Sequence, residues 1–573
     1  MCGRLRYRSE ANRKMASKGK KQSDRRITGA SPGASQDGGD KVISRLQWLL
    51  ALALTAFIAG LHFTLARHAG GLWRDEVNSI NLATMPALAD VWKLNQFDSF
   101  PVLWFLVLRC WTAAAGAAND SGLRVLGLVV GLGILAALWL CARRFLKFSV
   151  PLVSLVLIGS NPEIIRWGDS MRAYGPGTLM IILACGLLWR ALQSPTPRRV
   201  ALAAAGAILA VQTLFQNAVL LFAVCTACII VAVRRSLWRR ALMVSGIGLT
   251  AALTLLPYIG TAGRLHQWNM LVKTPLTYER IWVELTAMLG SAGSFMTAVW
   301  FALTVAALAA AAVAQARRLS PGLSDYKRDL ALFAGSALVL GAVSYCVFLK
   351  FLSYNTSPWY YIAPAAFSAL AIDAALSVFM EAPLVKAARL AAMVLVAAFS
   401  IQASWNSAQG RQTSVDLIAA HLQANASVDD LIVINSWELG ITFDRYYRGA
   451  TQWLTIPPLD SHKLHRYDSV KALMSEREPI KPVIEAMGRT LRSGRRVWIV
   501  GGLPLLPPGQ APQILPPPPL PDSGWHAEPY QSSWLGQAGY FLQYHSTGAR
   551  VKIFGELVSP YECPVLEVAE GWK

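Results

Sequence analysis

Long apolar runs constrain this chain more than any other feature of its sequence. Each run is about 16–30 residues long, and an α-helix needs about 20 residues to cross a hydrocarbon core of about 30 Å. The runs are continuous, whereas amphipathic helices and strands of soluble proteins show apolar stripes with periods of about 3.6 or 2. Charged residues make up only 15% of the chain, against roughly 25% in globular domains. These features exclude an ordinary soluble enzyme and predict a polytopic membrane protein.

Twelve segments are candidate membrane spans. They are 46–66, 101–118, 122–142, 151–166, 175–193, 201–214, 216–233, 241–260, 283–314, 330–350, 358–378 and 388–405. Basic pairs beside spans mark the cytoplasmic face, which places 67–100 outside and allows only one net crossing between 101 and 142. Either one of the two segments there is interfacial, or Arg143 and Arg144 lie outside. We therefore predict an all-α membrane domain of about 11–13 spans over 46–405, with the part of the chain after 405 on the outer side.

The formal charge of +21 would on its own be compatible with a nucleic-acid partner. The basic residues instead gather in short segments beside the apolar runs, as topology requires, so we predict no nucleic-acid partner. Residues 1–45 are polar and contain twelve Lys or Arg against four acids, which predicts a disordered basic cytoplasmic tail. The first apolar run has no small-residue cleavage site after it, which favours a retained span over a signal peptide.

The composition changes after about residue 411. Helical periodicity over 413–423 and 479–493 alternates with short apolar strands at 430–435 and 496–500. Segments 540–543 and 550–554 resemble the two strands of a terminal hairpin. The sequence therefore predicts a small α/β domain over 411–573, on the periplasmic side of the membrane.

The first outer loop, 67–100, contains the motif Trp73-Arg74-Asp75-Glu76 and, further on, Lys93. Two adjacent carboxylates point in different directions, so one can deprotonate an acceptor while the other orients it. The aromatic ring offers a stacking surface, and the two cations offer phosphate contacts. The alternative is that the two acids are simply solvated loop residues.

A second polar cluster lies between two apolar runs and includes Glu163, Arg166, Asp169, Arg172 and Tyr174. An arginine at a membrane interface is costly unless it is paired or used, which makes it a functional candidate. The planar fork of Arg172 suits a phosphate or diphosphate. A purely structural pair between Arg172 and Asp169 is the alternative.

Other signals are weaker. His266 lies in an outer loop, the polar pair Gln216-Asn217 interrupts an apolar run, and Pro358-Trp-Tyr-Tyr361 is also typical of an interfacial aromatic belt. The Cys225/Cys228 pair has redox or metal spacing, but it lies within a predicted span and is interpreted as packing. No cofactor is identified. The sequence gives no dedicated metal site and leaves a divalent-metal requirement open.

Taken in order, these motifs resemble the GT-C class of integral-membrane glycosyltransferases. The most similar branch contains the protein O-mannosyltransferases and the aminoarabinose transferase of lipid A. The early Asp-Glu motif is matched by Asp75-Glu76, the acidic-x-x-Pro-Pro-Leu stretch by Asp98-Ser-Phe-Pro-Val-Leu103, the Arg-Leu-Pro element by Arg124-Val-Leu126, and the Arg-x-Tyr element by Arg172-Ala-Tyr174. The match covers about 65–180, and the hydropathy agrees to about 405.

The chain also departs from the pattern. Val102 replaces the second proline, Phe215-Gln-Asn217 stands where the family has a Thr-His-Tyr-like tip, and Trp359 replaces the late arginine of a Pro-Arg-Tyr element. The C-terminal domain shows no such match. The resemblance implies the reaction class, but the missing late arginine weakens inference about how the donor phosphate is held there.

The resemblance implies transfer of a sugar, as a hexosyl or pentosyl group and with inversion, from a polyprenyl-phosphate donor at the bacterial inner membrane. The acceptor would be an envelope glycan, lipid or protein on the periplasmic face. The catalytic candidates are Asp75 and Glu76; donor-binding candidates are Arg172, Arg74, Lys93 and Tyr174; substrate-orienting candidates are Asp169, Asp98, Trp73 and His266. Two rival hypotheses are a transporter or flippase of lipid-linked saccharides and a structural or assembly protein.

Overall fold

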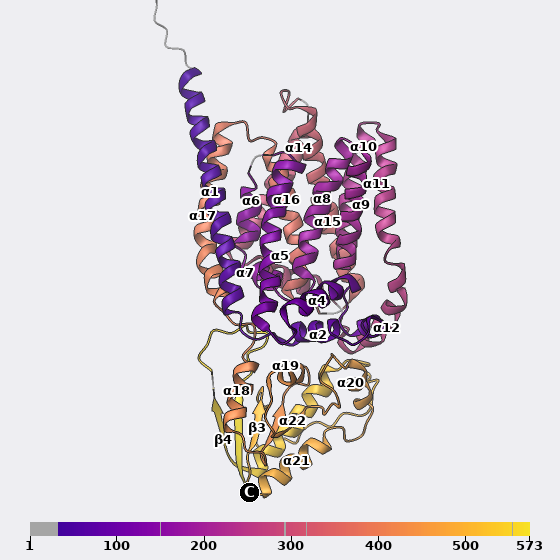
Figure 1. Cartoon of the computed structure of the whole chain (residues 1–573), viewed down its shortest axis with the longest axis vertical. Coiled ribbons are helices and arrows are strands. Elements are labelled where there is room, and N and C mark those ends of the chain that lie inside the picture. The colour runs from indigo at the N-terminus through magenta and orange to yellow at the C-terminus, as the bar shows by residue number, and fades with distance from the viewer. Residues whose placement is uncertain are drawn as a thin grey trace, which may run out of the picture.

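The computed structural model describes residues 33–148, 150–274, 276–290, 294–316, 318–353, 355–552 and 554–573. The side chain of the predicted site residue His266 lies outside the described part, as do residues 1–32 of the predicted tail. A bundle of helices forms one end of the molecule, and a smaller domain containing a sheet forms the other (Figure 1). The predicted class, an all-α membrane domain followed by a small α/β domain, is confirmed.

Nine helical segments in the described part are long and apolar enough to cross a membrane. They are formed by α1 (Gly33–His68), α5 (Asp120–Leu140) with the π-helical turn after it, α8 (Tyr174–Gln193), α10 (Asn217–Arg234), α11 (Trp238–Leu253) together with α12 (Ile259–Val272), α14 (Phe295–Gln315), α15 (Asp325–Leu352), α16 (Ile362–Ser377) with the turn before it, and α17 (Pro383–Ala408). The predicted spans 151–166 and 201–214 correspond to shorter elements of the same bundle: α6 (Leu152–Ser154), a π-helical turn (Leu155–Gly159), α7 (Pro162–Gly168) and α9 (Pro197–Thr213). The helix α13 (Tyr278–Leu289) precedes α14.

The helix α4 (Val102–Ala115) decides which of the two predicted spans between 101 and 142 crosses the membrane. Its 14 residues span about 21 Å, less than a hydrocarbon core of about 30 Å. Figure 1 places it beside α2 (Arg74–Ala83) at the end of the bundle that faces the C-terminal domain. The helix α3 (Leu88–Leu94) lies between them in the chain. Of the two predicted spans, α5 is therefore the one that crosses.

The start of α1 and the C-terminal domain lie at opposite ends of the bundle (Figure 1). Residues 33–45, which we predicted as part of a disordered tail, belong to α1. At the other end, Arg166 donates hydrogen bonds to the carbonyl oxygens of Ser407 (2.9 Å) and Arg411 (3.2 Å). These bonds tie α7 to the short connection between α17 and the C-terminal domain.

The C-terminal domain has a five-stranded sheet in the order β2-β1-β3-β5-β4. Strands β1 (Leu431–Ile434), β2 (Gln452–Thr455) and β3 (Val497–Val500) are parallel, and β5 (Leu566–Trp572) is antiparallel to β3 and β4 (Ser546–Lys552). Every residue of β1 and β3 is buried, as expected for parallel strands covered on both faces. The helices of this domain are α18 (Val415–Asn425), α19 (Leu439–Tyr446), α20 (Tyr467–Leu473), α21 (Lys481–Arg492) and α22 (Glu528–His545).

The predicted terminal hairpin is wrong in its first strand, because 540–543 belongs to α22. Trp534, Ala538 and Leu542 are buried at intervals of four residues, which is the spacing of a helix. The strand was predicted from the short aromatic stretch 540–543 alone, which is too short to show this spacing. The hairpin exists, but β4 and β5 form it.

Candidate functional site

A polar pocket of about 200 Å³ lies where the membrane domain meets the C-terminal domain. The loop and helices after the first span contribute Asp75 and Asp98, the segment before α8 contributes Arg172, and the first residue of α8 is Tyr174. The structure therefore brings together four residues that the sequence analysis selected from three separate motifs. The C-terminal domain contributes His465 to the opposite wall.

Asp75 lies in the first turn of α2 and keeps 20% of its side chain exposed. One carboxylate oxygen lies 3.2 Å from Nε2 of His465, and the other lies 3.9 Å from the guanidinium of Arg172. Burial would raise the pKa of Asp75, but the charge of Arg172 and the contact with His465 outweigh burial and hold that pKa well below its usual range. The group is therefore an anion in a pocket that also holds a cation.

Arg172 is held rigidly by the residues beneath it. Its Nη1 contacts Asp98 and donates to the hydroxyl of Ser79 (2.8 Å) and to the carbonyl oxygen of Asp75 (3.0 Å). Its guanidinium carbon lies 4.4 Å from the ring centre of Phe100. The Nε atom of Arg172 is buried and has no hydrogen-bond partner. A guanidinium that is held in place at the wall of a pocket is suited to binding an anionic oxygen.

Glu76, predicted as a catalytic partner of Asp75, lies beneath the pocket and is fully buried. Its carboxylate accepts hydrogen bonds from Arg124 (2.6 Å), from the backbone N–H of Met171 (2.9 Å) and from that of Trp73 (3.1 Å). These contacts join the start of α2 to α5 and to the loop that carries Arg172. The geometry favours a structural role for Glu76 over contact with a substrate.

Asp169, predicted to orient substrate, also lies outside the pocket lining. It is buried and lies 2.7 Å from Nδ1 of His62 on α1. A Cβ atom on Gly127 would come within 2.0 Å of the carbonyl oxygen of Asp169, so α5 approaches this loop as closely as a glycine allows. Asp169 therefore anchors one end of the loop that ends in Arg172, and the suggested Arg172–Asp169 pair is not formed.

Three other predicted residues do not line the pocket. Trp73 is 1% exposed, and its ring centre lies 5.0 Å from that of Trp167 and 5.4 Å from that of Trp359. The indole therefore has no exposed face on which a sugar could stack. The Arg74 guanidinium lies 3.7 Å from Asp75, at the edge of the site. Lys93 is exposed on α3, away from the pocket lining. The donor-binding roles of Arg74 and Lys93 remain predictions.

Sequence reasoning gave no role to the C-terminal residues of the pocket, His465 and Tyr467. They follow β2 in a segment with no motif, so only the tertiary structure could find them. Gln216 and the aromatic residues Trp359 and Tyr360 also line the pocket. The sequence did contain a signal for these residues. Gln216 belongs to a polar pair that interrupts an apolar run, and the two aromatic residues stand at the start of a predicted span.

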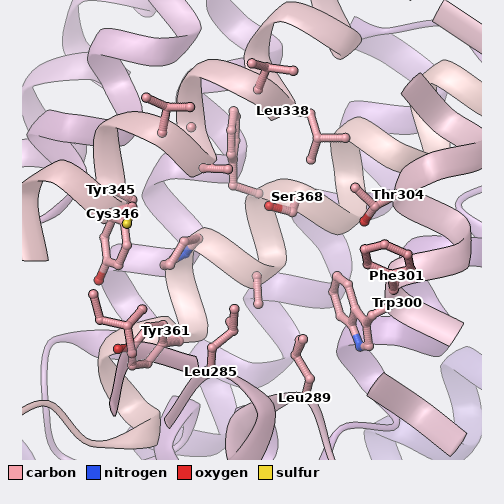
Figure 2. A pocket seen from close by; sticks show the side chains of 18 of the residues that line it. Leu285, Leu289, Trp300, Phe301, Thr304, Leu338, Tyr345, Cys346, Tyr361 and Ser368 are labelled. Carbon is pink, nitrogen blue, oxygen red and sulfur yellow. The ribbon is translucent and has the colours of Figure 1, made fainter. Parts of the chain in front are cut away.

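A second, apolar cavity of about 440 Å³ lies between α13, α14, α15 and α16. Figure 2 shows Tyr345 and Tyr361 on one side of it and Trp300 and Phe301 on the other. The hydroxyl oxygen of Tyr345 lies 2.5 Å from the carbonyl oxygen of Tyr360 and 3.1 Å from Oε1 of Gln216, which lines the polar pocket. Consecutive residues of the turn Pro358–Tyr361 face different cavities, since Tyr360 lines the polar one and Tyr361 the apolar one. One layer of side chains therefore separates the two cavities.

Comparisons with known proteins give distant structural likenesses. No family model and no curated protein matches the chain. The chain is similar to ArnT from Cupriavidus metallidurans bound to undecaprenyl phosphate, with 13% identity and a TM-score of 0.48, over 79% of this chain and 92% of that one. It is also similar to the oligosaccharyltransferase of Archaeoglobus fulgidus, with 14% identity and a TM-score of 0.43, over 79% of this chain and 68% of that one. At such scores the chemistry has to be inferred from the residues of the site itself.

Proposed function

We propose that this protein is a membrane glycosyltransferase of the GT-C type that moves a sugar from a polyprenyl-phosphate carrier to an acceptor. The observation that carries the proposal is the pairing of cavities. A pocket holding Asp75 and Arg172 adjoins an apolar cavity at the layer formed by Tyr345, Gln216 and the Pro358–Tyr361 turn. An amphiphile with an anionic head and a long hydrocarbon tail would meet a surface of its own polarity in each cavity once the side chains of this layer rotate aside.

The proposed reaction uses Asp75 as general base and Arg172 as the phosphate-binding cation. A hydroxyl or amine of the acceptor attacks the anomeric carbon as the bond from that carbon to the phosphate oxygen breaks. Asp75 takes the acceptor proton, and the bond electrons leave with the lipid phosphate. Arg172 stabilises the growing negative charge on that phosphate, which is the largest electrostatic demand of the transition state.

Donor binding would also prepare the base. Arg172 and His465 hold the pKa of Asp75 well below its usual range, which makes the carboxylate a poor proton acceptor. A phosphate bound to Arg172 would offset the cationic charge near Asp75 and raise its pKa. We therefore propose that the donor binds before the acceptor is deprotonated.

The proposed location is the bacterial inner membrane, with the N-terminus in the cytoplasm and the C-terminal domain in the periplasm. An outward-facing site lacks nucleotide-sugars, so a lipid-linked donor fits this orientation. Transfer of a hexosyl or pentosyl group with inversion is the expectation carried by the family resemblance. The acceptor is an envelope glycan, lipid or protein.

Replacement of Asp75 by Asn and of Arg172 by Ala tests the proposal. Mass spectrometry of a deletion strain should reveal an accumulated polyprenyl-phosphate sugar and a missing envelope decoration. Wild-type protein should reverse both changes, whereas either variant, at normal membrane levels, should reverse neither. Full restoration by both variants would contradict the enzymatic proposal and favour a transporter or an assembly protein.

A further inference from the structure

The loop between β2 and α20, residues 456–466, docks directly on the helix that carries Asp75. The backbone N–H of His465 donates to the side-chain oxygen of Asn78 (2.9 Å), and the side chain of Asn81 donates to the carbonyl oxygen of Lys463 (2.8 Å). Asn78 and Asn81 follow Asp75 at intervals of three residues, so all three lie along one face of α2. The C-terminal domain thus contacts α2 at Asp75, Asn78 and Asn81.

The His465 ring is held in place at the end of this loop. Its side chain is 8% exposed, and its ring centre lies 6.0 Å from that of Trp437 and 5.8 Å from that of Tyr467. Asp75 is anionic and can only accept hydrogen bonds, so the Nε2 that lies 3.2 Å away carries the proton and donates it. The other ring nitrogen, Nδ1, is buried and has no hydrogen-bond partner. The contact with Asp75 is therefore the polar bond that the imidazole makes.

Asp75 is consequently fixed by two domains at once. Arg172 of the membrane domain approaches one carboxylate oxygen, and His465 of the C-terminal domain contacts the other. Without the second contact, the carboxylate could rotate towards Arg172 and form a closer ion pair. A carboxylate paired in this way would be worse placed to receive the proton of the acceptor.

We propose that His465 is a positioning residue of the catalytic site, supplied by the C-terminal domain to orient the carboxylate of Asp75. The inference rests on the proposed glycosyl transfer, and it makes the C-terminal domain a part of the active site. The role of His465 is to donate one hydrogen bond, and the proton of the acceptor still goes to Asp75.

Two variants of the full-length protein separate the hydrogen bond from the packing. His465→Phe keeps an aromatic ring against Trp437 but cannot donate, whereas His465→Gln loses the ring and keeps an N–H that can reach Asp75. The assay uses membranes with the polyprenyl-phosphate sugar extracted from the deletion strain as donor. We expect His465→Phe to lower kcat about 10- to 100-fold with little change in the KM for the donor, since displacement by about 1 Å costs up to about 100-fold. His465→Gln should stay within about fivefold of wild type.

Asp460→Asn is the matched control, because Asp460 is exposed on the same loop. It should have wild-type activity, and all three variants should have wild-type thermal stability. Normal activity of His465→Phe would overturn the inference, and so would a His465→Gln variant as inactive as His465→Phe. The Asp75→Asn variant distinguishes this failure from failure of the proposed function. If it is inactive while both His465 variants are active, only the positioning role is wrong; if it is active, the proposed function is wrong.

Discussion

The carboxylate of Glu76 lies 2.6 Å from the guanidinium of Arg124, and both side chains are buried beneath the pocket that Asp75 lines. Two neighbouring acids in the chain therefore meet opposite environments. Asp75 is partly exposed beside a cavity, whereas Glu76 joins α2, α5 and the loop before α8. Of the two adjacent carboxylates that marked the site in the sequence, only Asp75 therefore faces the pocket.

We predict that Glu76→Leu destabilises the protein. Removing one partner of a buried ion pair leaves an unpaired charge, here Arg124, and typically costs about 3–5 kcal/mol. The expected result is a lower melting temperature in detergent and less protein in the membrane. Asp75→Asn is the control and should melt near wild type, because its side chain lies at a cavity. A stable but inactive Glu76→Leu variant would instead support the catalytic role that the sequence suggested.

We predict that Arg172→Lys weakens donor use without unfolding the site. A lysine can still pair with Asp98 through one nitrogen, but it lacks the second nitrogen of the fork, which faces Asp75. The KM for the lipid-linked donor should rise about 10-fold or more, since a charge-assisted hydrogen bond is lost. Initial rates at varied donor concentration measure this. Arg448→Lys, on the surface of the C-terminal domain, should match wild type, and an unchanged KM in Arg172→Lys would argue against phosphate binding by Arg172.

We predict that filling the apolar cavity weakens lipid binding. Ser368 lines this cavity (Figure 2), and Ser368→Phe would place a ring in the space offered to the hydrocarbon chain. Polyprenyl phosphate should raise the melting temperature of wild type, because a ligand bound only to the folded state stabilises it. The rise should shrink in Ser368→Phe and persist in Leu395→Phe, whose side chain lies exposed on α17. Equal stabilisation of all three proteins would place the tail elsewhere.

We predict that stability falls as the pH rises towards neutrality, because of Glu562. This residue of the C-terminal domain accepts hydrogen bonds from the backbone N–H of Arg74 (3.0 Å) and from the hydroxyl of Thr442 (3.0 Å). Burial raises the pKa of Glu562 from 4.5 to about 7, although Arg74 opposes the shift. The folded state therefore binds this proton more tightly than the unfolded state. Its stabilising contribution is complete below about pH 4.5 and is lost as the pH rises through about 7.

The Glu562→Gln variant tests this dependence, since the amide stays neutral at every pH. Melting temperatures of wild type should decline between pH 5 and 8, and those of Glu562→Gln should decline less. Parallel curves for the two proteins would assign the pH dependence to other groups.

Local pattern predicted much of this architecture. Apolar runs of membrane length predicted the bundle, and the change of composition after about 411 predicted the α/β domain. Asp75, Asp98, Arg172 and Tyr174 were selected from motifs, and the fold places all four around one pocket. The fold class could be predicted because span length and composition are properties of short segments, whereas the roles of the four pocket residues stay predictions.

The remainder depended on contacts between distant segments. His465 and Asn78 are 387 positions apart, and nothing near either residue in the sequence announces the other. Trp73 looked like an exposed stacking surface, but Trp167 and Trp359 cover it. The 14-residue α4 looked like a span because it is apolar, while its length and its contact with α2 keep it at the end of the bundle. The burial of a side chain and the identity of its partners depend on tertiary packing, and the order of residues along the chain does not specify that packing locally.

The loop 456–466, which carries His465 to the pocket, has a consequence for how the protein is made. This loop is synthesised after the membrane helices, so a growing chain contains Asp75 and Arg172 long before it contains His465. Under the proposed function, a truncated or stalled chain in the membrane would hold an open, unfinished pocket. Such a chain should leave the lipid-linked sugar unspent, and catalysis would begin only once the last domain has been exported and has folded onto α2.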